Sequence, residues 1–330
     1  MTRFATVLVI LALLVPLGLL LSLLIGSSAL TADQLLGGLV GRAGYEIERA
    51  ILFHIRLPRT LAALLAGVAL SLSGVLLQHV MGNPLAGPNT VGIHAGGGLF
   101  TVLFLSLFPT AVTLLPLATF LGGFLTTALI LAIAARAGGG RTTVILAGIA
   151  CTSLAGAGIS IFTILDTDVL AQYAAFSVGG FSGVSTDMLL LPALLVGLSL
   201  ALSLILSRRL TVLSLGDAPA AALGLRVARL RMLALLLASL SAAAAISFAG
   251  LLGFVGLAVP HITRRLVGYG LFRELCTAPL VGGFLLMMAD LAARTLFAPS
   301  DIPVGILTAL LGAPFFLILL MKARGRHAGI

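Results

Sequence analysis

Long apolar runs follow one another along the whole chain, and the short segments between them hold most of the charges. A helix needs about 20 mostly apolar residues to cross the hydrocarbon core of a bilayer, and ten runs approach this length. They cover residues 4–25, 57–80, 91–107, 113–135, 142–165, 188–206, 230–248, 251–267, 276–296 and 303–321. The third and the eighth are short or interrupted by Gly or Pro. The pattern predicts an all-α polytopic membrane protein with about ten transmembrane helices, forming a single domain over residues 1–330.

Composition supports this class. Of the 330 residues, 60% are hydrophobic and only 9% are charged, whereas soluble domains contain about 25% charged residues, so a water-soluble fold is excluded. The alternation of a β-barrel is absent, and the 39 glycines suit helices that pack through small residues. Cys151 and Cys276 fall inside apolar runs, so they form no disulfide framework and no metal-ligand pattern.

The distribution of basic residues predicts the orientation. If the N-terminus is cytoplasmic, the inner segments hold 14 of the 19 Lys and Arg residues, and the outer side or outer helix ends hold the other 5. The five are Arg42, Arg49, Arg56, Arg59 and Arg294. This bias follows the positive-inside rule and explains the net charge of +9 without nucleic acid. We expect both termini to be cytoplasmic and the protein to be multi-pass in the inner membrane.

The chain lacks the residues that nucleotide hydrolysis, metal binding or covalent catalysis would require. A P-loop needs a lysine that reaches the nucleotide phosphates, and the sole lysine, Lys322, lies in the C-terminal tail. The five histidines have neither metal-ligand spacing nor a nucleophile beside them, so no catalytic residue, cofactor or metal site is expected. Only Asp290 lies deep in an apolar run, and Arg294 follows it by one helical turn, so the two are expected to pair or, alternatively, Arg294 contacts a partner. The energy for any transport should therefore come from another protein.

The segment at about 207–229 is the longest cytoplasmic connection in this arrangement. Gly216 and Asp217 precede an Ala-rich stretch with Pro219 in its first turn, and Gly224 can end it in a left-handed conformation. The pattern predicts a short amphipathic helix, which is either an ordinary connector or a dock for the groove of another protein.

Seven blocks, in order along the chain, resemble the FecCD-type permeases, the family that imports iron–siderophore complexes, haem and cobalamin. Together they cover nearly the whole chain from Arg56 onward. They are Arg56-Leu57-Pro58-Arg59, residues 74–78, residues 83–92 with the glycines at 96–97, Leu215-Gly216-Asp217 with Leu223-Gly224, residues 253–264, Ala289-Asp290 with Arg294, and residues 302–305 with 312–315. The absence of Trp and the Gly82 before Asn83 are small departures.

The resemblance implies a type II ABC importer permease fold, in which two copies pair and the fifth and tenth spans line the path between them. In this chain the fifth span carries an i,i+4 row of small or mildly polar residues. The row is Gly148, Thr152, Gly156 and Ser160. It suits close helix packing and a translocation path about equally, and the resemblance favours the path.

The resemblance also assigns partner contacts. Arg56, Arg59 and Arg294 are expected to meet carboxylates of a periplasmic or lipoprotein substrate-binding protein, although such arginines also serve as interfacial anchors. Coupling to two copies of an ATP-binding subunit is expected from Leu215, Gly216, Asp217, Ala221, Leu223 and Gly224. A gate or ATPase contact is expected, more weakly, from Asn83, Pro84, His261 and Arg264.

The expected function is therefore that of a permease subunit, not an enzyme, which moves an iron–siderophore complex across the cytoplasmic membrane while a separate ATPase supplies the energy. Haem or cobalamin is the alternative cargo within the same class. A secondary transporter driven by an ion gradient is the alternative of another class, and it would need buried carboxylates near mid-membrane. A homodimer is expected, although two different permeases can also pair.

Overall fold

The computed structural model describes residues 3–26, 30–298 and 300–324, and every regular element in these residues is helical. The elements are α1 (Arg3–Leu24), α2 (Ala32–Val40), α3 (Glu46–Ala50), η1 (Ile51–Arg56), α4 (Leu57–Met81), η2 (Pro88–Val91), α5 (Ile93–Leu107), η3 (Val112–Leu114), α6 (Leu115–Arg136), α7 (Arg141–Leu165), α8 (Thr167–Val178), α9 (Asp187–Leu213), α10 (Asp217–Ala222), α11 (Val227–Ala249), α12 (Val255–Val267), α13 (Leu271–Thr295) and α14 (Val304–Arg324). The prediction of an all-α fold is confirmed.

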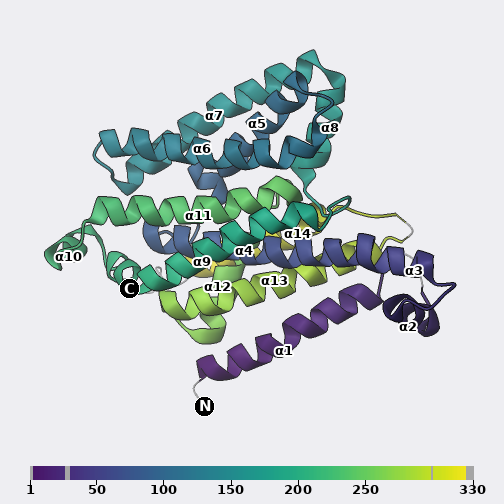
Figure 1. The fold of residues 1–330 in the computed structure, drawn as a ribbon. Helices are drawn as coiled ribbons and strands as arrows, with labels where there is room; N and C mark the ends of the chain where they lie inside the picture. Colours follow the sequence, from purple (N-terminus) through teal and green to yellow (C-terminus); the bar gives the residue numbers. More distant parts are fainter. Residues whose placement is uncertain (1–2, 27–29, 299, 325–330) are drawn as a thin grey trace.

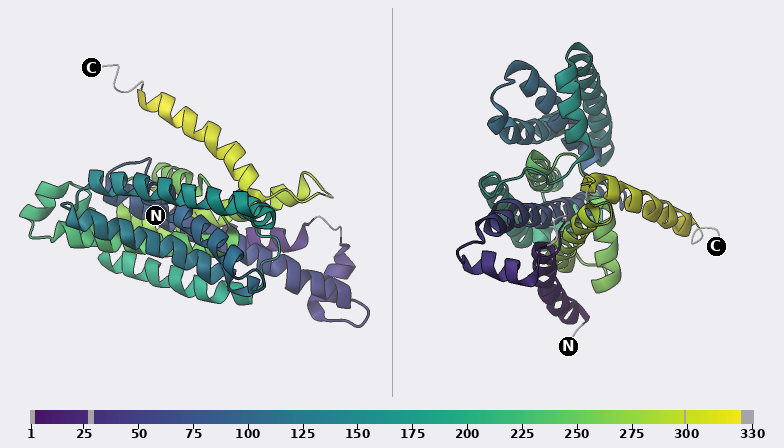
Figure 2. Two further views of the ribbon diagram at one scale, coloured as in Figure 1. Left: turned by 90° about the horizontal axis from the view of Figure 1, so that it is seen from above. Right: turned by 90° about the vertical axis from the view of Figure 1, so that its right-hand side faces the viewer.

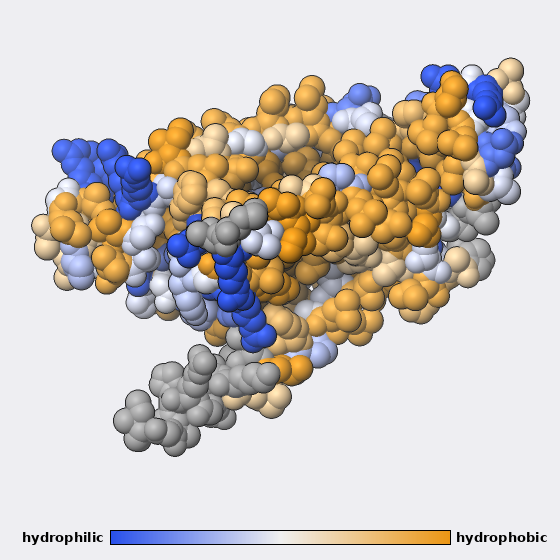
Figure 3. Space-filling model, turned by 90° about the horizontal axis from the view of Figure 1, so that it is seen from below, coloured by the Kyte–Doolittle hydropathy of each residue, from blue (hydrophilic) through white to orange (hydrophobic). Residues whose placement is uncertain are grey.

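Each of the ten predicted spans corresponds to a helix. Seven helical stretches in the described residues are long and apolar enough to cross a membrane by length and composition. The other three spans are α5, α12 and α14, and the predicted short third and eighth spans are indeed the short helices α5 and α12. Hydrophobic residues cover most of the face drawn in Figure 3, with hydrophilic groups gathered at its two ends, as a membrane-spanning bundle requires.

Six elements in the connections were not predicted. The short helices α2 and α3, with η1, precede α4, η2 and η3 lie before and after α5, and α8 follows α7. The signals were present: Thr31 and Gln34 form a capping box at the start of α2, and the Asp166 side chain accepts from the backbone N–H groups of Asp168 and Val169 to cap α8.

Helix α4 forms the centre of the bundle, packed against α11, α12 and α13. Glycines bring these backbones together. A Cβ atom on Gly67 would lie 2.1 Å from the Gly282 carbonyl oxygen of α13, and one on Gly74 would lie 1.9 Å from that of Gly256 on α12. No side chain fits at such distances, so the small residues of α4 are what permit the contact.

Helices α5, α6, α7 and α8 form a second group beside this centre, joined to it mainly through α6 and α11. Helix α14 leaves the rest of the bundle, as the two views of Figure 2 show. The start of α1, the end of α12 and α10 lie toward one end of the molecule, whereas α2 and α3 lie at the other. The chain therefore has two distinct ends, with long helices running between them.

Candidate functional site

A buried ionic cluster lies at the end of the molecule that carries α2 and α3. Arg59, on the first turn of α4, places its Nε atom 3.0 and 3.1 Å from the two carboxylate oxygens of Asp290 on α13. Its Nη1 atom donates to Asp301, just before α14, at 2.6 Å. Arg59 and Asp290 are both buried. The pair therefore clamps α4 to α13 and neutralises the intramembrane carboxylate.

Arg294 extends the cluster to α1. Its Nη2 atom donates to the Ser22 hydroxyl at 2.6 Å and also to the Ser22 carbonyl, and its Nε atom lies 3.6 Å from Asp290. The predicted Asp290–Arg294 pair is thus confirmed. The sequence analysis missed the nearer partner, Arg59, because it lies 231 residues away along the chain.

Arg56 holds the end of α1 through hydrogen bonds to backbone carbonyl groups. Its Nη1 atom donates to the carbonyl oxygens of Leu23 at 2.8 Å and Leu24 at 2.9 Å. These are terminal carbonyls of a helix, which a cation stabilises both by hydrogen bonding and through the helix dipole. Arg56 is the last residue of the π-helical turn η1, two residues before Pro58, which offers no N–H to the helix.

The three arginines expected to dock a binding protein therefore gather at one end but point into the chain. All three are buried, with their guanidinium groups held by α1, α13 and Asp301. The expectation had placed them on the outer surface, and the structure instead gives them internal partners, because burial of an unpaired cation is costly. Docking by these residues stays a prediction.

A second buried cluster lies near the opposite end. Glu274 of α13 is fully buried, with one carboxylate oxygen 3.0 Å from His79 Nε2 on α4 and the other 2.9 Å from Arg264 Nε on α12. The sequence analysis did not identify this cluster. A carboxylate shared by three helices fixes their ends relative to one another.

The residues expected at a gate or ATPase contact surround this cluster without forming one site. Arg264 is held by Glu274, and His261 Nδ1 lies 3.2 Å from the Leu257 carbonyl oxygen of its own helix. Asn83 and Pro84 form the turn that ends α4, where the Asn83 side chain accepts from the Leu85 N–H at 2.9 Å. Their role at a gate stays a prediction.

The expected coupling segment contains the predicted short helix. Helix α9 extends beyond its predicted end to Leu213, α10 covers Asp217–Ala222, and Gly224 has a φ of 81°. Leu215 and Leu223 are 65% and 66% exposed, which leaves an apolar surface facing outward. Such a surface beside a short helix suits a groove on another protein.

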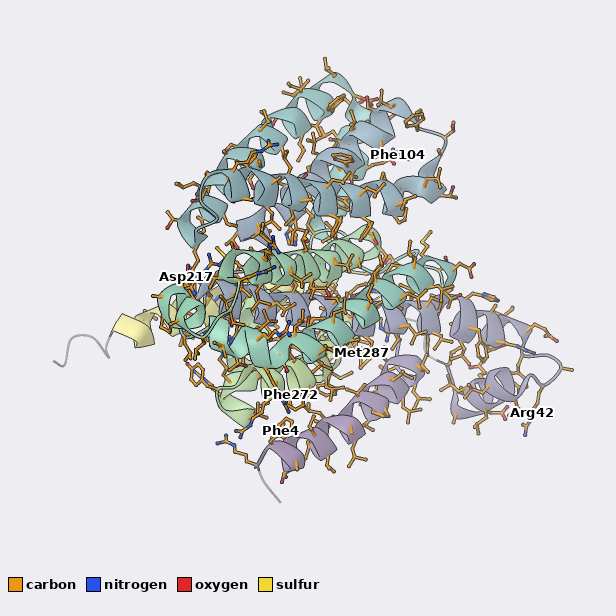
Figure 4. All side chains as sticks on the ribbon, turned by 60° about the vertical axis from the view of Figure 1, so that its left-hand side comes forward. Phe4, Arg42, Phe104, Asp217, Phe272 and Met287 are labelled. Atoms are coloured by element: carbon orange, nitrogen blue, oxygen red, sulfur yellow. The ribbon has the colours of Figure 1, made fainter. Side chains whose placement is uncertain are left out.

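The side chain of Asp217 pairs with arginines of two other helices and does not cap α10. The N-cap is Gly216, and the Asp217 carboxylate instead binds Arg231 of α11, with Arg141 of α7 3.6 Å away. The hydrogen bond from Arg231 lowers the pKa of Asp217 below its ordinary value. A hydrogen bond between a carboxylate and a charged guanidinium is stronger than one between a carboxylate and an uncharged backbone N–H at the helix start. The Asp217 carboxylate therefore binds Arg231. In Figure 4, Asp217 lies at the opposite end of the molecule from Arg42.

The expected path row lies on α7, and three of its four members are exposed. Thr152, Gly156 and Ser160 face outward, and a Cβ on Gly156 would meet nothing within 4 Å. Gly148 is buried and packs against the Thr90 carbonyl oxygen of η2. One member of the row therefore makes a packing contact, and the other three form an open face. Lining of a path by this face stays a prediction.

A separate crevice of about 370 Å³ opens between α6, α9 and α11. Its lining is largely apolar and includes Phe120, Met188 and Leu195, with Asp187 at the start of α9. None of the residues of the α7 row contributes to it.

Comparison with known proteins places this geometry in context. The model of the FecCD transport family matches residues 12–322. The chain is 35% identical over 285 residues to the hemin transport system permease protein HmuU of Yersinia pestis, covering 84% of the chain and 85% of that protein. It is 36% identical over 292 residues to the Fe(3+) dicitrate transport system permease protein FecD of Escherichia coli (strain K12), covering 86% and 88%.

A third relative covers almost the full length. The chain is 33% identical over 323 residues to the iron-uptake system permease protein FeuB of Bacillus subtilis (strain 168), covering 96% of the chain and 95% of that protein. A solved structure described as an inward-facing conformation of a metal-chelate type ABC transporter superposes with a TM-score of 0.86 at 33% identity. The superposition covers 96% of this chain and 99% of that one.

Proposed function

Because this chain belongs to the FecCD transport family, we propose that it is the permease subunit of an ABC importer that carries an iron–siderophore complex across the cytoplasmic membrane. Relatives in this family are permeases for iron chelates and hemin, and the chain itself is a multi-pass membrane protein. The permease performs no covalent chemistry, and a separate ATP-binding subunit provides the energy.

The observation that carries this proposal is the exposed coupling segment. Helix α10 is too short to span a membrane, and Leu215 and Leu223, which lie just before and just after it, are exposed at one end of the bundle. An apolar surface of this kind in a membrane protein needs a protein partner, since water would otherwise meet it. An ATPase subunit that binds there can convert nucleotide binding into movement of α10.

The open face of α7 supports a path between two permease copies. Thr152, Gly156 and Ser160 present small and mildly polar groups where a bulky chelate can pass. An exposed row on a single chain becomes an enclosed path once a second copy faces it. We therefore propose a homodimer with two ATPase subunits, in which α7 and α14 face the partner copy.

The charges at the two ends of the molecule support an orientation in the membrane. Arg3 donates to the Arg265 carbonyl oxygen at 2.6 Å, so the start of α1 and the end of α12 share an end with Asp217 and its arginines. By the positive-inside rule this end faces the cytoplasm. The end with α2 and α3 then meets the substrate-binding protein outside. Arg326, one of the basic residues assigned to the cytoplasmic side, lies outside the described part of the chain.

Binding-protein docking by Arg56, Arg59 and Arg294 needs those side chains to exchange internal partners for external ones. Asp301 is the most exposed carboxylate of the cluster, so a docking protein would first compete for Arg59 there. Arg59→Gln separates the two roles. Weaker binding with unchanged thermal stability supports docking, whereas loss of stability alone assigns Arg59 to the fold.

ATP-dependent uptake in proteoliposomes tests the function. The purified permease is reconstituted with its ATPase and binding protein and offered iron–siderophore, haem and cobalamin in turn. We expect uptake that requires ATP and the binding protein. Uptake driven by an ion gradient without the ATPase would contradict the proposal.

Haem is the second candidate cargo, because HmuU is among the relatives. The same uptake panel distinguishes the two cargoes. The cluster around Asp290 argues against ion coupling, since that carboxylate already has Arg59 and Arg294 as partners and offers little to a transported ion.

A further inference from the structure

Helix α10 is held to the bundle by few buried contacts. Of its six residues only Ala220 is buried, so packing alone transmits little force from this helix to its neighbours. An element that must pass on a movement needs a firmer connection. The Asp217 carboxylate, on the first residue of α10, provides one.

One carboxylate oxygen of Asp217 serves two cations from two helices. Arg231 of α11 donates to Oδ1, and the Nη2 atom of Arg141, the first residue of α7, lies 3.6 Å from the same oxygen. The Asp217 side chain is 52% exposed, whereas that of Arg231 is only 3% exposed. A buried guanidinium is costly to leave unpaired, so the contact to Arg231 is the firm one and the contact to Arg141 is the adjustable one.

Both arginines connect Asp217 to the start of α7. Arg141 begins that helix, and Arg231 also donates from Nη1 to the Gly139 carbonyl oxygen, at 2.9 Å, in the turn just before it. Asp217 therefore reaches the start of α7 by a direct contact and by a second route through Arg231.

Arg141 also lies against the end of α4. A Cβ atom on Gly82 would be 2.4 Å from Arg141 Nη1, and Gly82 ends α4 with a φ of 60°. The side chain of Arg141 thus sits between the end of the buried central helix and the carboxylate on α10.

We propose that Asp217, with Arg141 and Arg231, forms a coupling joint that transmits movement of α10 to α7. The proposal rests on the proposed function, since it assumes that an ATPase subunit moves α10 and that α7 lines the path. Asp217 is a positioning residue here, because it touches neither cargo nor nucleotide. Its effect is on the ratio of transport to ATP hydrolysis.

The test measures cargo taken up per ATP hydrolysed in proteoliposomes. Asp217→Asn keeps the size of the side chain and removes its charge. We expect the ATPase activity of the complex to persist while transport per ATP falls about ten-fold, a typical coupling factor. Asp217→Glu, which keeps the charge, should retain most of the coupling. Arg136→Gln is the matched control, because Arg136 is an exposed cation at the end of α6, outside the segment at 207–229, and has no ion pair among the described residues.

A second variant keeps the proposal testable if Asp217→Asn fails to fold. Arg141→Gln removes the direct contact to Asp217 and leaves the route through Arg231 in place, so it should lower transport per ATP less than Asp217→Asn does. If Asp217→Asn and Arg141→Gln transport as much per ATP as the wild type, the joint is refuted. If both variants lose the ATPase subunit or its activity together with transport, the residues are structural, which also overturns the proposal. A wild-type complex without ATP-driven uptake would instead refute the proposed function.

Spin labels give a readout that a structural role would not affect. One label on the exposed Ala150 of α7 and one on the exposed Phe272 of α13, which is ion-paired to α4, report the position of α7 relative to α4 with and without trapped ATP. We expect a nucleotide-dependent movement of α7 in the wild type that is lost in Asp217→Asn. Identical movement in both proteins would contradict the joint.

Discussion

Helices α4 and α7 have the same length and similar hydropathy, yet they occupy opposite environments. Each has 25 residues, and the mean hydropathies of their spans are 2.2 and 2.0. In the span that contains α4, 78% of the apolar 18-residue stretch is buried inside the chain, against 17% in α7. Apolar character alone therefore does not tell a helix that forms the centre from one that faces lipid or a partner.

The difference lies in what the small residues and the helix ends contact. Gly67 and Gly74 of α4 lie directly against neighbouring backbones, whereas Gly156 of α7 faces open space. Buried ion pairs hold both ends of α4, through Arg59 to Asp290 and through His79 to Glu274. The ion pair at the start of α7 reaches the half-exposed Asp217. We infer that α4 is a fixed scaffold and α7 a helix that can move.

The largest effect is expected from breaking the clamp on α4. Asp290→Ala leaves Arg59 and Arg294 without their shared buried carboxylate, and we expect a loss of about 3–5 kcal/mol in the free energy of unfolding. Denaturant unfolding in mixed micelles measures it. Asp301→Ala is the matched control, since this partner of Arg59 is 41% exposed and should cost at most about 1 kcal/mol. Equal losses for the two would contradict the scaffold role.

Replacing one glycine of each helix by alanine should change the free energy of unfolding by a smaller amount, with opposite sign in the two helices. Gly74→Ala forces α4 away from α12 and should cost about 1–3 kcal/mol. Gly156→Ala meets no neighbour and should stabilise α7 by about 0.5–1 kcal/mol through helix propensity. Thermal unfolding of both variants in one detergent compares them directly. A destabilised Gly156→Ala would show that α7 packs as tightly as α4.

The smallest expected effect is the contribution of Asp217 to stability, which depends on pH. The Arg231 hydrogen bond lowers the pKa of Asp217 below its ordinary value of 3.8, so its contribution is complete above that pH and is lost as the pH falls through the lowered pKa. Because Asp217 is half-exposed, the contribution should stay below about 1 kcal/mol. The difference in melting temperature between wild type and Asp217→Asn should therefore be constant from neutral pH down to about pH 4. A difference that varies between pH 5 and 8 would contradict this pKa direction.

The spans and the coupling helix could be predicted because their causes are local. An apolar run of sufficient length specifies a membrane helix, and Gly216, Pro219 and Gly224 mark the two ends of α10. The capping residues Thr31 and Asp166 were equally local signals for α2 and α8, and a search for caps in the connections would have found both helices.

The ionic clusters could not be predicted, because their members meet only in the folded bundle. Arg59 and Asp290 lie on different helices, and a charge near a helix end is equally consistent with solvent, a partner or a buried acid. For the same reason the sequence placed Arg56, Arg59 and Arg294 at the outer end but could not reveal that they point inward.

The most direct test of the role of α7 in the path is thiol labelling of its open face. In a protein with Cys151 and Cys276 replaced by Ala, single cysteines at Thr152, Gly156 and Ser160 are compared with one at Leu194, an exposed apolar residue of α9. A charged, membrane-impermeant reagent should label the three α7 positions rapidly and Leu194→Cys slowly, and loaded binding protein should protect the α7 positions. Labelling of all four positions at the same slow rate would show that α7 faces lipid and would contradict its role in the path.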